Sequence, residues 1–93
     1  MRKAYLLVFS DSTGGRPVIR AWASGEKKAV LHWRYDMPHS MYLISEKSAA
    51  DLAASLTRRL GRKGRFLITE ITDNRQGLLP EDTWNLLREK RRT

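Results

Sequence analysis

Two short apolar runs constrain the fold of this 93-residue chain more than any other feature. Residues 4–9 read AYLLVF and residues 41–45 read MYLIS, and they are the most continuously apolar segments of the chain. Apolar runs without alternation are typical of strands that are buried on both faces of a sheet. We therefore expect these two segments to be central strands.

Turn and capping residues place the other elements. The stretch SDSTGGRP contains local hydrogen-bonding residues, two glycines and Pro17, which suits the first turn of a helix. Ser48 and Asp51 resemble a capping box, and GRKG ends the helix that they open. The stretch DMPHS predicts a hairpin between two strands. The expected elements, in order, are strand 4–9, helix 17–25, strand 29–35, strand 41–45, helix 48–60, strand 65–72 and a final helix from residue 80.

This order of elements predicts an α+β fold of the ferredoxin-like class. The pattern β-α-β-β-α-β is the split βαβ arrangement, for which we expect an antiparallel sheet with the strand order 4-1-3-2. We also expect strands one and three to be central and parallel to each other. The length predicts a single domain over residues 1–93, with a core at 1–76 and a C-terminal helical extension at 77–93.

The expected strand directions assign polar residues to two opposite edges of the sheet. One edge should gather Asp11, Ser12, Glu46 and Arg65. The other should gather Arg2, the hairpin 36–40, Asp73, Asn74 and Arg75. These two edges are therefore the expected locations of any site.

The helices of such a fold cover one face of the sheet, although the central strands are apolar on both faces. An open apolar face of that size is unusual in a monomer. Either the C-terminal segment, which contains Leu78, Leu79, Trp84 and Leu87, folds over it, or a second copy does. We expect both, that is, a homodimer in which the two sheets face each other and the C-terminal segment reaches across the dimer interface.

The formal net charge of +8 is concentrated in two basic clusters. Their members are Arg58, Arg59, Arg62, Lys63 and Arg65 in the first, and Arg88, Lys90, Arg91 and Arg92 in the second. Clustered Lys and Arg favour binding to polyanions, because each neutralised phosphate releases counterions. These clusters predict contact with a nucleic-acid backbone (DNA or RNA), and the alternative interpretation is a solubilising surface.

Composition excludes several other classes of site. The chain has no cysteine, so disulfides, thiolate metal sites and thiol nucleophiles are excluded. No segment approaches the roughly 18 apolar residues that a membrane span requires. We therefore expect a cytoplasmic protein without a membrane anchor.

The motif LLVFSDS, at the end of the first expected strand, resembles a feature of a known group. Together with the split βαβ order and the C-terminal segment, it is similar to the small subunit of CRISPR adaptation and to VapD-type ribonucleases. The resemblance implies a dimer in which two aspartates meet and support Mg²⁺-dependent cleavage of nucleic acid, a role that would fall on Asp11. The chain differs from that group in having Ser10 between the aromatic residue and Asp11.

Each candidate site residue also has a structural interpretation. Asp11 is either an Mg²⁺ ligand and catalytic residue or a turn-former that accepts backbone N–H groups. His39 is a candidate general acid or base if Asp36 or Asp73 orients it. The predicted function is a small basic homodimer that contacts phosphate backbone and is related to nucleases. The alternatives are a non-catalytic subunit that binds a protein partner through its sheet, and a regulatory module.

Overall fold

The two apolar runs form the central strands of a four-stranded antiparallel sheet, as predicted. The computed structural model describes residues 1–90. β1 (Lys3–Phe9) lies between β3 (Ser40–Ser45) and β4 (Phe66–Ile71), and β2 (His32–Tyr35) pairs with the other side of β3. The order β2-β3-β1-β4 is the predicted order read from the opposite edge.

The predicted direction of the third strand was wrong. β1 and β3 are antiparallel, with Lys3 opposite Ser45 and Val8 opposite Ser40. A hairpin reverses the chain between β2 and β3, so β3 runs against β2 and against β1 on its other side. The C-terminal end of β1 therefore lies beside the beginning of β3 and not beside its end.

Turn and capping residues mark the starts of the first two helices. A 3₁₀ turn, η1 (Asp11–Thr13), leads through Gly14, which has a φ of 99°, into α1 (Arg16–Gly25). At the start of α2 (Ala49–Leu60) the Ser48 hydroxyl accepts a hydrogen bond from the Asp51 N–H at 3.1 Å, which confirms the predicted cap. The third helix is α3 (Glu81–Glu89).

The second strand is shorter than the alternating pattern predicted. The carbonyl of Glu26 accepts hydrogen bonds from the N–H groups of Ala29 and Val30, at 3.0 and 2.7 Å. The backbone is therefore still turning after α1. The Leu31 N–H makes the first hydrogen bond to β3, with the Ile44 carbonyl at 2.9 Å, and the strand itself begins at His32.

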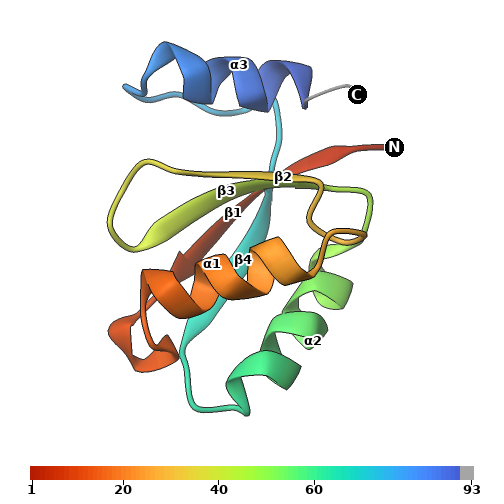
Figure 1. Ribbon diagram of the computed structural model, residues 1–93. Coiled ribbons are helices and arrows are strands. Elements are labelled where there is room, and N and C mark those ends of the chain that lie inside the picture. The colour runs from red at the N-terminus through yellow and green to blue at the C-terminus, as the bar shows by residue number, and fades with distance from the viewer. Residues whose placement is uncertain (91–93) are drawn as a thin grey trace.

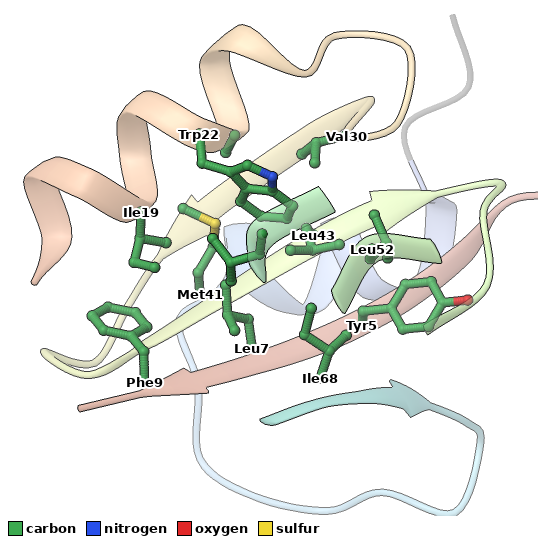
Figure 2. Packing of buried hydrophobic residues seen from close by; sticks show 12 residues of the cluster. Tyr5, Leu7, Phe9, Ile19, Trp22, Val30, Met41, Leu43, Leu52 and Ile68 are labelled. Carbon is green, nitrogen blue, oxygen red and sulfur yellow. The ribbon is translucent and has the colours of Figure 1, made fainter. Parts of the chain in front are cut away.

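The helices form layers on both faces of the sheet. Figure 1 shows α1 and α2 on one side and α3 on the other. On the first side, Ile19 and Trp22 of α1 point into a core that includes Leu7, Met41 and Leu43 (Figure 2). None of the helices within residues 1–90 is long and apolar enough to cross a membrane.

The C-terminal helix covers the second face of the sheet of its own chain. Leu86 and Leu87 of α3 pack against Ala4, Tyr42 and Ile44, all of them at most 5% exposed. Apolar burial of this kind drives the docking of an amphipathic helix on a sheet. Cover by the C-terminal segment is thus confirmed, but it lies on the sheet of its own chain and not, as predicted, across a dimer interface. The homodimer itself stays a prediction.

Candidate nucleic-acid interface

The turn after β1 brings Asp11 and His39 together. His39 Nε2 lies 2.9 Å from Asp11 Oδ1, and both side chains are exposed, at 54% and 90%. The backbone fixes this proximity, because the Phe9 N–H donates to the carbonyl of His39 at 3.0 Å. A carboxylate can only accept, so the neutral imidazole donates from Nε2 and has Nδ1 as its acceptor nitrogen.

Two predicted placements around this turn were wrong, and both errors follow from the direction of β3. His39 pairs with Asp11 and not with Asp36 or Asp73. Glu46 follows the end of β3, which lies opposite Lys3 at the beginning of β1. Glu46 is therefore at the other end of the sheet from Asp11, whereas the hairpin 36–40 lies beside Asp11.

The turn is joined to the segment that precedes β4, as predicted for Ser12 and Arg65. The Arg65 N–H donates to Ser12 Oγ at 3.2 Å, and the Ser10 N–H donates to the Arg65 carbonyl at 3.0 Å. Ser10 and Ser12 also share a hydrogen bond between their hydroxyls, and Thr13 Oγ1 donates to the Ser10 carbonyl at 2.8 Å. The position of the basic segment is thereby tied to the position of the turn.

The turn does not by itself fit an Mg²⁺ ion. Mg²⁺ requires oxygen ligands in near-octahedral geometry, and it usually takes one or two carboxylates. Asp11 supplies one carboxylate, and His39 already contacts its Oδ1 atom. Residues 1–90 contain no cluster of three or more His, Asp or Glu side chains arranged to hold a metal. The Mg²⁺ site that the resemblance implies would thus need a second Asp11 from another copy.

The first basic cluster spans the last turn of α2 and the loop that joins α2 to β4. We call Arg58, Arg59, Arg62, Lys63 and Arg65 the basic loop. All five are exposed, and none of them forms an ion pair within the part of the chain that the structure describes. Arg58 and Arg59 lie in the last turn of α2, where the helix dipole favours positive charge. Within residues 1–90, these charges are therefore open to an external anion.

The second basic cluster is not part of the same surface. Arg88 lies 3.6 Å from Glu81 and donates to Asn85 at 2.6 Å, so its charge is partly compensated. The Lys90 carbonyl accepts from Arg2 at 3.3 Å, which places it at the start of β1, while Arg65 lies at its end. At about 3.3 Å per residue, the two ends of β1 are separated by about 20 Å. Arg91 and Arg92 lie outside the described residues.

A third basic surface, which the sequence interpretation missed, combines arginines of α1 with aromatic residues of β2. The Arg16 guanidinium lies 4.6 Å from the centre of the Tyr35 ring, and that of Arg20 lies 5.8 Å from the Trp33 ring. The two rings meet edge to face at 5.5 Å. These distances are those of cation–π contacts. We call these four residues the arginine–aromatic strip.

Tyr35 is held firmly within this strip. Its hydroxyl donates to the carbonyl of Arg16 at 2.9 Å. Burial raises the pKa of Tyr35, and the positive charges of Arg16 and Arg20 oppose that rise. The spacing of Arg16 and Arg20 by four residues, and of Trp33 and Tyr35 by two, was a signal that could have indicated two facing rows.

A cavity of about 570 Å³ opens at the edge strand β2, next to the strip. Trp33 belongs to both, and Leu86 of α3 also lines the cavity. The cavity lining contains Lys27, His32 and Arg34 and no acidic residue. Arg34 is held in place by the hydrogen bond from its Nε to Thr83 Oγ1, at 2.8 Å.

The polar turn after β4 bonds to itself. Arg75 lies 3.6 Å from Asp73 and donates to the carbonyl of Thr72 at 3.0 Å. These contacts favour a structural role for this turn, at the start of the connection to α3.

No protein-family model, curated protein or solved structure matches this chain. Function is therefore argued from the residues and the geometry.

Proposed function

We propose that this chain is a ferredoxin-like, nucleic-acid-associated protein that holds the phosphate backbone through the basic loop. The observation that carries the proposal is the gathering of five exposed cations, without an ion pair among the described residues, at the end of α2 and in the loop that follows it. An exposed cation that is paired with a carboxylate has little attraction left for phosphate. The basic loop has no such partner within the described residues. The cytoplasmic location expected from the sequence remains part of this proposal.

Backbone contact of this kind has a quantitative signature. Each phosphate neutralised by Lys or Arg contributes about −0.9 to the slope of log K against log salt concentration for duplex DNA. If all five side chains of the basic loop bind phosphates, the slope is about −4.5. Binding should be insensitive to base sequence, because phosphates are the same at every position.

The test is fluorescence anisotropy with labelled duplex DNA and RNA over a range of salt concentrations. The variant Arg59→Glu/Lys63→Glu reverses two charges in the basic loop and should reduce affinity at least tenfold. The control Arg88→Glu/Lys90→Glu reverses two charges in the other cluster and should change affinity by less than threefold. Equal losses from the two variants would show that net charge, and not the loop, is responsible.

Cleavage is a separate proposal that rests on the resemblance to nucleases. Asp11 is 90% exposed, so a second Asp11 from another copy could approach it. Asp11→Asn should then abolish Mg²⁺-dependent cleavage of nucleic acid and leave the affinity within twofold of wild type. Metal-dependent cleavage that survives this substitution would remove Asp11 from the catalytic role.

A different observation favours a protein–protein role as a second function. β4 is an edge strand, and Leu67 is 63% exposed beside Val8, which is 42% exposed and opposite it in the sheet. We propose that a second copy pairs along β4. An antiparallel pairing centred on Thr69 would place the Arg65 end of each strand beside the Asp73 end of the other, and opposite charges favour such a register.

Sedimentation velocity tests this dimer. The wild type should have a dimeric mass at tens of micromolar, and Leu67→Lys should be monomeric with an unchanged melting temperature. A monomeric wild type would refute edge pairing. Unlike a sheet-to-sheet dimer, edge pairing leaves α3 in place on its own sheet.

A further inference from the structure

We infer that the arginine–aromatic strip and the cavity beside it bind single-stranded nucleic acid, with nucleobases stacked on the guanidinium groups. This inference rests on the proposed nucleic-acid binding and adds the strandedness of the substrate and a second contact surface. The inference depends on one observation. Arg16 and Arg20 of α1 make cation–π contacts with Tyr35 and Trp33 of β2, and these two rings meet edge to face.

The strip is preorganised for stacking. Each guanidinium lies over an aromatic ring within cation–π distance, so its position is already restricted on that side. Both arginine residues are exposed to solvent. An arginine plane is a stacking surface for unpaired bases and adds a positive charge near the phosphates. A base that stacks on Arg16 orders few additional torsions, because the contact with the Tyr35 ring and the hydrogen bond from Nε to the Pro38 carbonyl already restrict that side chain.

The cavity extends the strip by one binding position. Its volume of about 570 Å³ lies within the range of small-ligand sites, and it shares Trp33 with the strip. Lys27, His32 and Arg34 line the cavity without any acidic residue, which suits a nucleotide that carries a phosphate. A nucleotide entering from the strip would pass from a stacked position to one with several cationic donors.

A single strand fits this surface better than a duplex does. Bases in a duplex are stacked on one another and show only their edges, whereas a single strand presents whole base faces. An acidic peptide would satisfy the cations but would bring no planar group for the guanidinium faces. The occupant that uses both the charges and the flat surfaces is therefore single-stranded DNA or RNA.

The turn after β1 connects the strip to the basic loop. Arg16 Nε donates to the Pro38 carbonyl in the β2–β3 hairpin at 3.3 Å, and His39 of that hairpin contacts Asp11. On the other side of the turn, Ser12 accepts from the backbone of Arg65. A strand held by the basic loop can therefore continue around the turn to the strip.

The experiment compares a labelled single-stranded dT 12-mer with a 12-base-pair duplex, each titrated with wild type and variants. Arg16→Ala/Arg20→Ala should lower affinity for the single strand at least tenfold and change duplex affinity less than threefold. Arg88→Ala/Lys90→Ala removes the same charge elsewhere and should change both affinities less than threefold. Equal losses on the single strand and the duplex, or a loss no larger than that of the control, would overturn the inference.

Tryptophan fluorescence supplies a second readout that pure charge attraction would not change. Stacking next to Trp33 should quench emission when unlabelled dT 12-mer is added, and Trp33→Phe should abolish that quenching. Trp84→Phe, a matched substitution on α3, should retain it. Quenching that persists in Trp33→Phe would place the bases elsewhere. If the strip variants lower single-strand binding but Arg59→Glu/Lys63→Glu does not lower duplex binding, the strip is supported and the basic-loop proposal fails.

Discussion

Replacing Gly64 with alanine tests how closely the basic loop is packed against the turn that follows β1. A Cβ atom at Gly64 would lie 2.5 Å from Thr13 Cγ2 and 2.8 Å from Thr13 Cα. The second of these neighbours is backbone, so a change of side-chain rotamer cannot relieve the contact. The loop or the turn must shift, and the shift would strain the hydrogen bonds that Arg65 makes with Ser10 and Ser12.

Overpacking of this kind costs about 1–3 kcal/mol. Alanine also lowers the conformational entropy of the unfolded chain, which raises the free energy of unfolding by about 0.4–1 kcal/mol. This gain does not exceed the cost of overpacking, so the net effect is a loss of stability. For a domain of this size, 1 kcal/mol corresponds to about 4–8 °C in melting temperature. We therefore expect Gly64→Ala to melt several degrees below wild type when unfolding is followed by circular dichroism.

Gly25→Ala is the matched control, because no atom lies within 4 Å of its added Cβ and the residue ends α1. It should leave the melting temperature unchanged or raise it, since alanine favours the helix more than glycine does. If Gly64→Ala melts within 1 °C of wild type, or above it, the close approach of the basic loop to Thr13 is refuted.

Three further predictions concern stability. Ser55→Ala should destabilise the protein by about 1–3 kcal/mol in urea unfolding, because the buried Trp22 indole N–H that donates to Ser55 at 3.0 Å would lose its acceptor. Ser40→Ala removes the same atom but should be neutral or stabilising, because the buried Ser40 hydroxyl has no partner within residues 1–90; a loss like that of Ser55→Ala would contradict this. Burial raises the pKa of Tyr42 above 10.0, so the folded state binds the proton more tightly, and stability that is fully present below pH 10 should fall as pH rises further. Tyr42→Phe should reduce that fall in alkaline unfolding curves, and an unchanged slope would count against burial as the cause.

Strand order and helix ends could be predicted from the sequence because they depend on local patterns. The apolar runs at β1 and β3 indicate two-sided burial, and the Ser48 cap and the αL residue Gly61 mark the ends of α2. The contact between Asp11 and His39 spans 28 positions and depends on the direction of β3, so an error in that direction moved His39 to the wrong end of the sheet. A pattern of neighbouring residues does not predict a contact between residues so far apart in the sequence.

For a related reason, the sequence could indicate the two rows of the arginine–aromatic strip but not the contact between them. Helical spacing places Arg16 and Arg20 on one side of α1, but their contact with β2 depends on how α1 is rotated over the sheet. That rotation is set by the burial of Ile19 and Trp22 in the core. The apolar side of α3 likewise predicts that the helix packs on a sheet, but it does not encode whether that sheet belongs to its own chain.

The position of Asp11 determines what the turn can contribute to nucleic-acid binding. The hairpin is held to β1 by the backbone bond between Phe9 and His39, so the exposed carboxylate is not needed for that attachment. An exposed pair of this kind adds little stability. What Asp11 does is orient the His39 ring, whose Nδ1 is left to face other groups. The hairpin that carries this imidazole contacts Arg16 of the strip, and the turn that carries Asp11 contacts Arg65 of the basic loop, so a phosphate that crosses the turn would meet the His39 ring.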